Sequence, residues 1–220
     1  MTGAILAGGR GRRMGTNKAL LPFAGQRIID GLVGKFRALF PEVLVVGDDP
    51  APYADLEVRT VRDRVPGKGP VGGIYTALYH SAFAHTFCIA CDMPLANPAL
   101  IAYLCQQTAG YDVVVPRTPD GYQPLHAIYG KGCLCHLEAM LGADCLRVEA
   151  LFPVVRVRTV EAQELTRVDA SLASFVNVNT PEELDAALRL AAAREDETRQ
   201  GQAGGSGERE GARPGSGQHE

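Results

Sequence analysis

Short apolar runs rich in valine and isoleucine alternate along the chain with segments in which apolar residues recur at helical spacing. Most of the short runs are apolar at consecutive positions, as expected of strands that are buried on both faces. Alternation of such strands with helices is typical of an α/β domain with a mostly parallel sheet. The predicted strands cover residues 3–7, 43–46, 58–61, 86–90, 112–115, 154–157 and 175–178.

Three predicted helices carry recognisable start or stop signals. One follows Gln26, where apolar residues fall on one stripe until Pro41 ends the run. A second begins at Asn97 and has a proline in its first turn. A third begins at Thr180, and Glu183 three residues later completes the pattern of a capping box.

The composition changes sharply after residue 194. Residues 195–220 contain seven glycines and only two apolar residues, so they cannot bury enough surface to offset the entropy of ordering them. We therefore predict one folded domain in residues 1–194 and a disordered tail in residues 195–220. The tail holds six acidic and three basic residues, which leaves 19 of each in the domain. A neutral domain gives no support for a nucleic-acid partner.

The apolar segments indicate neither a membrane protein nor a secreted one. No run approaches the ~18 apolar residues of a membrane span, and the sequence begins with TGAILAGG rather than a basic leader and cleavage site. The six cysteines lie mostly within apolar segments, which predicts reduced thiols and a cytoplasmic protein. Cys88 and Cys91 are three apart on a predicted strand, so they face opposite sides and are not expected to chelate a metal.

A loop rich in glycine and arginine follows the first predicted strand, at residues 8–15, and Lys18 lies just beyond it. Glycines let backbone N–H groups approach an anion, and the guanidinium and ammonium groups would neutralise a triphosphate. A tight turn with solvated arginines would give the same composition. The spacing excludes a Walker loop, since Gly-Lys-Ser/Thr is absent, and Gly15 comes one residue late for a dinucleotide fingerprint.

Two aspartates and two asparagines follow other predicted strands. Asp92 comes after residues 86–90, where a carboxylate can hold Mg²⁺ against phosphate oxygens, and Asp63 has a similar place. Each aspartate alone also fits a turn or a helix cap. Asn177 and Asn179 lie two apart, as residues on one strand face do, and could bind metal or substrate or simply form the turn before Thr180. His126 is more consistent with packing than with substrate binding.

Five strings in this order resemble the molybdenum cofactor guanylyltransferase family: LAGGRGRRMGTNKALLPFAG, RDRVPGKGPVGGI, CDMP, QPLHAIY and FVNVNTPEEL. The resemblance implies a Rossmann-like nucleotidyltransferase domain, with a mostly parallel central sheet and helices on both faces. It implies an enzyme that uses Mg²⁺ to transfer GMP from GTP to molybdopterin and releases pyrophosphate. It also implies that the product passes to molybdoenzymes or their chaperones.

The family's functional residues can be carried onto matching positions of this chain. The resemblance implies catalytic roles for Lys18, Asp92 and Arg13, with Asp92 also binding the metal. It implies that substrates contact Leu6, Ala7, Gly8, Gly9, Lys18, Asp63, Gly69, Pro70, Gly72, Gly73, Asp92, Asn177 and Asn179. Within this set, residues 69–73 would shape the nucleoside pocket, and the two asparagines would face the acceptor.

Two departures and several alternatives accompany the resemblance. Asn17 stands where the family usually has an aspartate, which removes a charge beside Lys18. The chain reads VVGDDP where relatives can carry an asparagine near the nucleoside. A cytidylyltransferase of the same cofactor, a sugar-phosphate nucleotidyltransferase and a non-catalytic cofactor carrier remain alternatives. The presence of Lys18, Asp63 and Asp92 together favours an enzyme over a carrier.

Overall fold

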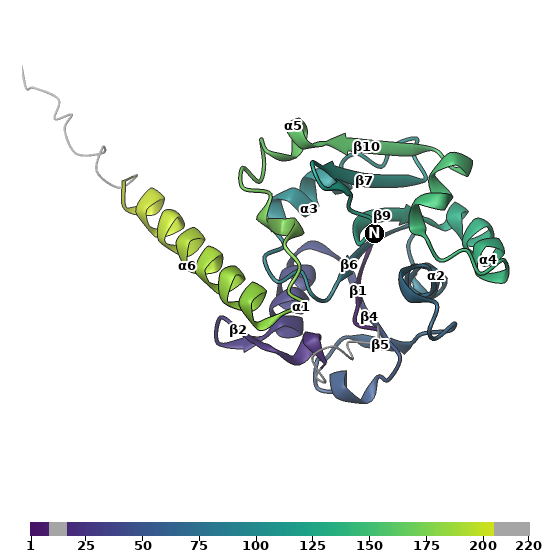
Figure 1. Ribbon diagram of the computed structural model, residues 1–220, viewed down its shortest axis with the longest axis horizontal. Coiled ribbons are helices and arrows are strands. Elements are labelled where there is room, and N and C mark those ends of the chain that lie inside the picture. The colour runs from purple at the N-terminus through teal and green to yellow at the C-terminus, as the bar shows by residue number, and fades with distance from the viewer. Residues whose placement is uncertain (9–16, 205–220) are drawn as a thin grey trace, which may run out of the picture.

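The computed structural model describes residues 1–8 and 17–204, with side chains as far as residue 194 (Figure 1). Within these residues, one central sheet of eight strands has the order β10-β7-β9-β6-β1-β4-β5, and β8 pairs with β7. The strands are β1 (Thr2–Leu6), β4 (Glu42–Gly47), β5 (Arg59–Arg62), β6 (His85–Ala90), β7 (Val113–Thr118), β8 (Gly121–Tyr122), β9 (His126–Gly130) and β10 (Val157–Glu161). The short strands β2 (Pro22–Phe23) and β3 (Gln26–Arg27) pair only with each other.

The sheet is mostly parallel, as the sequence predicts. β1 lies between β4 and β6 and pairs with both in parallel, β5 is parallel to β4, and β10 is parallel to β7. β9 runs antiparallel between β6 and β7. The chain adds β4 and β5 on one side of β1 and then crosses to add β6 on the other. This reversal places a topological switch point at the carboxyl ends of β1 and β6, where open α/β sheets bind ligands.

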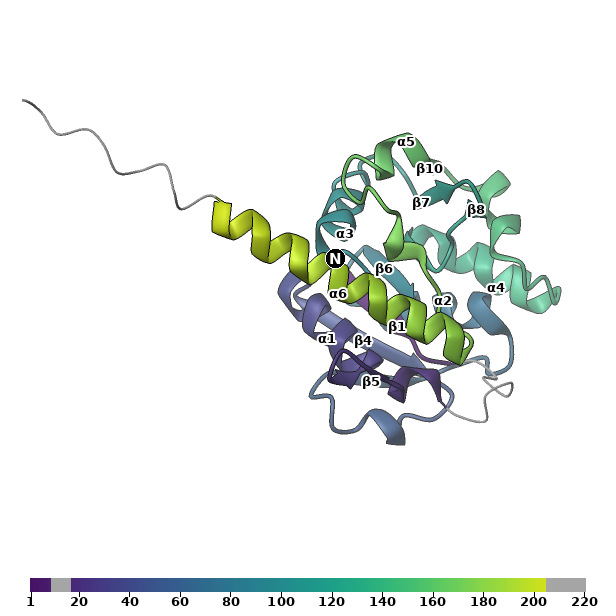
Figure 2. The same ribbon diagram turned by 60° about the vertical axis from the view of Figure 1, so that its left-hand side comes forward.

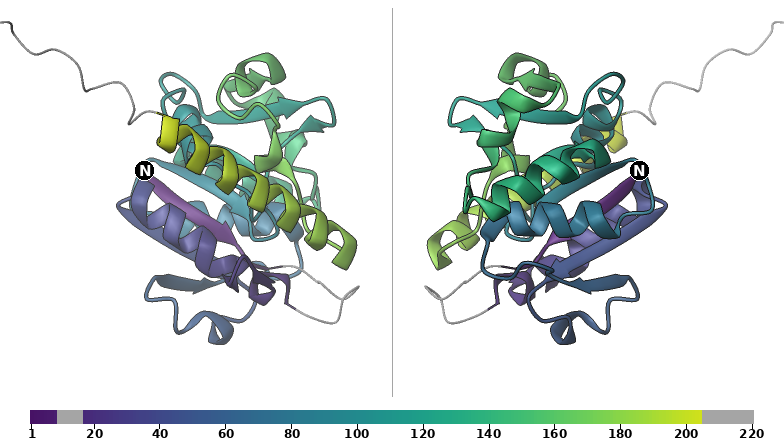
Figure 3. Two further views of the ribbon diagram at one scale, coloured as in Figure 1. Left: turned by 90° about the vertical axis from the view of Figure 1, so that its left-hand side faces the viewer. Right: turned by 90° about the vertical axis from the view of Figure 1, so that its right-hand side faces the viewer.

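Helices cover both faces of the sheet. One face carries α1 (Ile28–Leu39), α3 (Pro98–Cys105), α5 (Ala162–Leu165) and α6 (Pro181–Gly204), and the other carries α2 (Gly69–His80) and α4 (Leu134–Gly142). Figure 3 shows α1 and α6 in front of the sheet in its left-hand view, and α2 and α4 in front in its right-hand view. Along β1, Ile5 joins the first core whereas Ala4 and Leu6 join the second. Burial on both faces explains the continuous apolar runs.

Helix α1 follows from its apolar stripe, because five of its residues are buried against the sheet: Ile28, Ile29, Leu32, Val33 and Phe36. Its neighbour β1 approaches so closely that a Cβ at Gly3 would lie 2.4 Å from the Phe40 ring and 2.7 Å from the Phe36 ring. Only glycine fits at that point. The helix starts two residues later than predicted, since Gln26 and Arg27 form β3.

Two predicted strands differ from the structure. Residues 175–178 do not pair with the sheet: Phe175 ends the 3₁₀ helix η5 (Ala173–Phe175), and the backbone that follows packs its apolar side chains on the core. Residues 148–154 form the 3₁₀ helix η4 (Val148–Val154), so β10 begins at Val157, at the end of the predicted range. Pro153 has no N–H group for a strand ladder, while Val148 and Leu151 are buried within η4. In both cases tertiary packing overrides the local preference for strand.

The C-terminal helix also differs from the prediction. Thr180 Oγ1 accepts a hydrogen bond from Glu183 N at 3.2 Å, and Glu183 Oε2 accepts one from Thr180 N at 3.2 Å, which confirms the capping box. The helix then continues to Gly204, so residues 195–204 are helical where a disordered tail was predicted (Figure 2). Once a helix is nucleated, each further residue adds a hydrogen bond, and this stretch contains alanine, glutamate, glutamine and arginine. Residues 205–220 lie outside the described residues.

Candidate active site

The carboxyl ends of β1 and β6 bring two predicted functional segments together. Leu6 is in register with Ala90, and the N–H of Cys91 donates to the carbonyl of Leu6 at 3.1 Å. Ala7 and Gly8 therefore leave the sheet beside Asp92. The predicted proximity of the first loop to the CDMP segment is confirmed for these residues, whereas Gly9 and Arg13 lie outside the described residues.

A cavity of about 1110 Å³ opens at this edge of the sheet. Most of the predicted nucleotide-binding residues line it: Leu6, Ala7, Gly8, Lys18, Asp63, Gly69, Pro70, Gly73 and Asp92. A second pocket of about 220 Å³ is lined by Ala90, Asp92, Met93, Gln123, Pro124, Leu125, Asn177 and Asn179. Asp92 lines both spaces. The structure thus places one carboxylate between a large cavity and a smaller one.

Lys18 connects the two pockets. Its Nζ atom lies 3.8 Å from Asp92 Oδ2 and donates a hydrogen bond to Asn179 Oδ1 at 2.6 Å. The Lys18 and Asp92 side chains are each 21% exposed, so the pair is only partly screened by water. Burial raises the pKa of the Asp92 carboxyl, and the nearby Lys18 ammonium opposes that rise. An ammonium, a carboxylate and an amide are therefore held together at the junction of the pockets.

The second carboxylate oxygen of Asp92 makes the site suitable for a cation. Asp92 Oδ1 is buried and has no hydrogen-bond partner among the described residues. No group of three or more histidine, cysteine, aspartate or glutamate side chains that could hold a metal occurs in the described part of the chain. Mg²⁺ is commonly bound by one or two carboxylates with substrate phosphates and water completing its shell. The donor set fits an ion that arrives with a nucleotide.

Asp63 is buried at the far wall of the large cavity, where it organises the loop before α2. Its Oδ1 atom accepts hydrogen bonds from Thr76 Oγ1 at 2.7 Å and from Val65 N at 3.0 Å. Gly72 packs behind this loop, because a Cβ there would lie 2.9 Å from the Val65 carbonyl oxygen. Gly72 therefore shapes the cavity wall but does not line the cavity, whereas Asp63 does. That Asp63 contacts the nucleotide stays a prediction.

The two asparagines lie at the smaller pocket although they are not on a strand. The N–H of Val178, between them, donates to the backbone carbonyl of Asp92 at 2.8 Å. The N–H of Asn179 donates to Glu183 Oε2 at 2.6 Å, while its side chain accepts from Lys18. A backbone hydrogen bond to Asp92 and contacts with the start of α6 therefore hold this segment in place. The strand assignment is wrong, and both asparagines line the smaller pocket together with Asp92. That they face the acceptor stays a prediction.

Asn17, which stands where the family usually has an aspartate, has a structural role in this chain. Its Oδ1 atom accepts from the first turn of the 3₁₀ helix η1 (Lys18–Leu20), and its Nδ2 atom donates to Tyr53 Oη at 2.9 Å. Tyr53 Oη in turn donates to the Ala7 carbonyl at 3.2 Å. A neutral amide thus links the lysine helix to the loop after β1, and Lys18 pairs with Asp92 instead.

Several lining residues were missed from the sequence. Asp48 and Asp49 line the large cavity directly after β4, and Tyr53 lies beside them in the 3₁₀ helix η2 (Ala51–Tyr53). A signal for the aspartates existed, since the carboxyl ends of neighbouring parallel strands share one edge. Gln123 and Leu125 line the smaller pocket from the connection between β8 and β9, for which no such rule applies.

Most of the remaining candidate side chains pack in the interior or lie apart from the cavity, although Cys91 lines it. His126 is fully buried, and its ring lies edge-on to Phe87 and Phe175. This confirms the packing interpretation. All six cysteines are free thiols, and burial raises the pKa of Cys88 and of Cys91. No helix among the described residues is both long enough and apolar enough to cross a membrane.

Comparison with known proteins agrees with this geometry. A protein of Pelotomaculum thermopropionicum described as a probable molybdenum cofactor guanylyltransferase is 42% identical over 183 residues, covering 83% of this chain and 89% of that protein. The molybdenum cofactor guanylyltransferase of Desulfosudis oleivorans is 33% identical over 189 residues, covering 85% of this chain and 94% of that protein.

A solved structure and a family model extend the comparison. The crystal structure of molybdopterin-guanine dinucleotide biosynthesis protein A from Archaeoglobus fulgidus superposes with a TM-score of 0.77 at 28% identity, covering 88% of this chain and all of that one. Residues 3–160 match the model of the MobA-like NTP transferase domain. These residues include the strands β1 and β6 and the aspartate between the two pockets. The chain therefore belongs to the MobA-like NTP transferase family.

Proposed function

We propose that this protein transfers GMP from GTP to molybdopterin, forming the guanine dinucleotide form of the molybdenum cofactor and releasing pyrophosphate. The observation that carries the proposal is the position of Asp92, which lines both the large cavity and the small pocket. A volume of about 1110 Å³ is ample for a nucleoside triphosphate. The names of the related proteins support guanylyl transfer over cytidylyl or sugar-phosphate chemistry.

The residues present suit a reaction between two anions. A phosphate monoester has a second pKa near ~6, so the acceptor phosphate is largely ionised at neutral pH and needs no catalytic base. The enzyme then has to align acceptor and α-phosphate and to stabilise charge on the departing pyrophosphate. Lys18 holds its ammonium between the two pockets and provides a positive charge there. Asn177 and Asn179 offer neutral hydrogen-bonding groups on the acceptor side.

We infer that Asp92 holds the Mg²⁺ ion that accompanies the nucleotide. When bound, the ion would neutralise phosphate charge and favour release of pyrophosphate. Two observations support this assignment: Asp92 lines both pockets, and its Oδ1 atom has no hydrogen-bond partner among the described residues. Roles for Gly9 and Arg13 in binding the phosphate chain stay predictions from the resemblance. So do the cytoplasmic location and the transfer of product to molybdoenzymes or their chaperones.

A nucleotide competition assay tests the function. Purified protein with Mg²⁺ and a molybdopterin acceptor should release pyrophosphate with GTP at a much higher kcat/KM than with CTP, ATP or UTP. Preference for CTP would reject guanylyl transfer in favour of the cytidylyltransferase. Absence of transfer with every nucleotide, while pterin still binds, would favour the non-catalytic carrier. A variant with Asp92→Asn keeps the size of the side chain and serves as the inactive control.

A further inference from the structure

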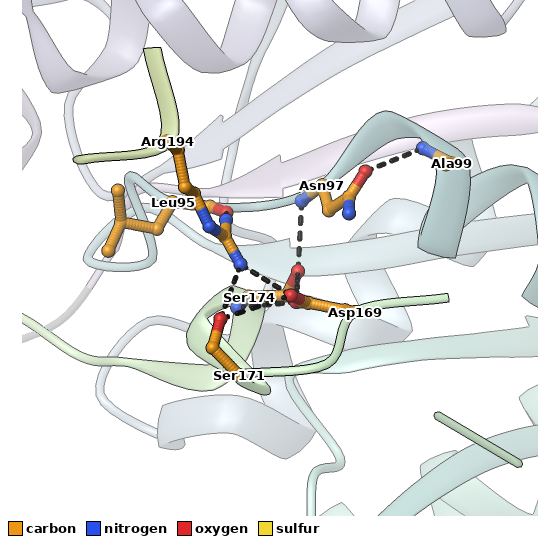
Figure 4. A network of polar contacts seen from close by, with 7 residues as sticks. All are labelled: Leu95, Asn97, Ala99, Asp169, Ser171, Ser174 and Arg194. Atoms are coloured by element: carbon orange, nitrogen blue, oxygen red, sulfur yellow. Dashed lines mark hydrogen bonds and ion pairs between the residues drawn. The ribbon is translucent and has the colours of Figure 1, made fainter. Parts of the chain in front are cut away.

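A buried polar network on the C-terminal part of the chain lies apart from both pockets (Figure 4). Asp169 is only 3% exposed, and its carboxylate accepts hydrogen bonds from the N–H of Ser174 at 3.0 Å and from Ser174 Oγ at 2.5 Å. Arg194, on α6, forms an ion pair with the other oxygen of Asp169. Removing a carboxylate from water costs free energy, which Ser174 and Arg194 offset here by binding Asp169. Both of these residues also contact other groups.

The network contacts the loop that carries Asp92. Arg194 Nη1 donates to the backbone carbonyl of Leu95 at 3.0 Å, and Ser174 Oγ accepts from the N–H of Asn97 at 3.0 Å. Figure 4 shows Arg194 and Ser174 approaching this loop from different segments of the chain. Asp169 accepts hydrogen bonds from both Arg194 and Ser174. Its carboxylate therefore holds the two side chains that contact the loop backbone between β6 and α3.

Two further contacts hold the same loop. Lys35 Nζ, on α1, donates to the carbonyl of Pro94 at 2.8 Å. The N–H of Val178 donates to the carbonyl of Asp92 itself at 2.8 Å. Backbone groups at residues 92, 94, 95 and 97 are thus each bonded to another part of the fold. Four of the seven residues that connect β6 to α3 are therefore restrained through their backbone groups.

We propose that Asp169 and Arg194 are positioning residues that hold the Asp92 carboxylate in place for the metal and the phosphates. This inference rests on the proposed function. Catalytic groups have to be held to within about 0.5 Å, and outer residues that orient a metal ligand typically affect metal affinity ~10- to 100-fold. Both residues lie beyond residues 3–160, which match the family model. These two residues of the C-terminal segment therefore contribute to the active site although they line neither pocket.

Variants at Arg194 and Ser174 test the proposal, with Arg158→Ala as matched control. Arg158 and Arg194 are similarly exposed, at 25% and 30%, and each forms an ion pair with an acidic residue. Arg158, however, bridges β10 and α5 through Glu164, and among the described residues its hydrogen bonds go to Thr159 and Glu164 rather than to the Asp92 loop. Both variants lose a partly buried arginine and an ion pair, but only Arg194→Ala removes the partner of a buried carboxylate, since Asp169 is 3% exposed and Glu164 is 28% exposed. An effect on the loop is expected only at Arg194.

Two measurements on the full chain decide the matter: hydrogen exchange of residues 91–97, and affinity for Mn²⁺ in the presence of GTP by electron paramagnetic resonance. We expect Arg194→Ala to speed exchange and weaken Mn²⁺ binding about tenfold, with partial recovery in Arg194→Lys and no change of either in Arg158→Ala. Equal exchange and equal Mn²⁺ affinity in Arg194→Ala and Arg158→Ala would overturn the proposal.

Ser174→Ala keeps the test decisive if Arg194→Ala does not fold. It removes the bond to Asn97 without leaving an unpaired buried charge, and we expect it to change exchange and Mn²⁺ affinity in the same direction. Unaltered values in that variant would count against positioning. If the parent protein binds no Mn²⁺ with GTP, the proposed function fails instead, and the exchange of residues 91–97 still decides whether the network holds the loop.

Discussion

The buried imidazole of His126 should make the stability of this protein strongly dependent on pH. Neither ring nitrogen has a hydrogen-bond partner among the described residues, and the ring centroid lies 5.2 Å from that of Phe87 and 5.0 Å from that of Phe175. Burial lowers the pKa of His126 to about 3, which Asp169 partly opposes and Lys35 reinforces. The folded protein therefore keeps this residue neutral through the mildly acidic range.

The sign and size of the effect follow from linkage. Because the pKa of His126 is lower in the folded state than its ordinary value of 6.5, the unfolded state binds more protons between pH 6.5 and pH 3. Stability is fully present above pH 6.5 and is lost as the pH falls through that window. At ~1.4 kcal/mol per pKa unit, acidification from pH 7 to pH 5 should cost ~2 kcal/mol through this residue alone.

Replacing His126 with phenylalanine tests this reasoning. Phenylalanine is of similar size and suits the two neighbouring aromatic rings, and it cannot bind a proton. The free energy of unfolding in urea should fall by ~2 kcal/mol less in His126→Phe than in the parent between pH 7 and pH 5. Calorimetry should show the same difference as a shift of ~4–8 °C in Tm.

A second variant separates titration from packing. His126→Gln keeps a polar side chain that is neutral at every pH, so it should lose stability at neutral pH through poorer packing yet share the weaker response to acid. If the parent and both variants lose the same free energy between pH 7 and pH 5, the explanation based on a buried neutral histidine is wrong.

Three further changes have defined outcomes. Burial and the Arg194 charge lower the pKa of Lys35 to about 8. The unfolded state therefore binds more protons than the folded state between pH 8 and about 10.5, so the free energy of unfolding of the parent should rise across that window. Urea unfolding of Lys35→Met should lack this rise. Asp92→Asn should reduce turnover by ~10²- to 10³-fold with an unchanged melt, and near-normal pyrophosphate release would exclude Asp92 from the active site. Gly3→Ala should destabilise the protein by ~1–3 kcal/mol, because its methyl group would overlap the Phe40 ring, and an unchanged Tm would contradict that packing.

The parts of the fold that could be predicted from sequence are those in which local pattern and global burial agree. β1, β4 and β6 are apolar on both faces, and their ends match the predicted runs to within one residue. The same agreement placed Asp92 at the correct sheet edge, beside the loop that follows β1. The fold also brings Lys18 to Asp92, and the order of the motifs along the chain does not by itself predict this contact.

The parts that could not be predicted depend on contacts between distant residues. Residues 175–178 have the composition of a strand, but their apolar side chains pack on the core and their backbone does not pair with the sheet. The hydrogen bond from Arg194 to the Leu95 carbonyl joins residues 99 positions apart, and no hydrophobic periodicity in the sequence predicts it. Asp48 and Asp49 look like ordinary turn residues until β4 is known to be the neighbour of β1.

The segment that runs from Asp169 to Arg194 has a consequence for how the enzyme matures on the ribosome. Synthesis proceeds from the N-terminus, so every residue that lines the large cavity has been synthesised once residue 125 has emerged. Asn177, Asn179 and the side chains that hydrogen-bond the Leu95 and Asn97 backbone, those of Arg194 and Ser174, are synthesised only later. A chain truncated before Asp169 would thus contain the residues that line the nucleotide cavity but neither the amides of the small pocket nor the side chains that hold the Asp92 loop.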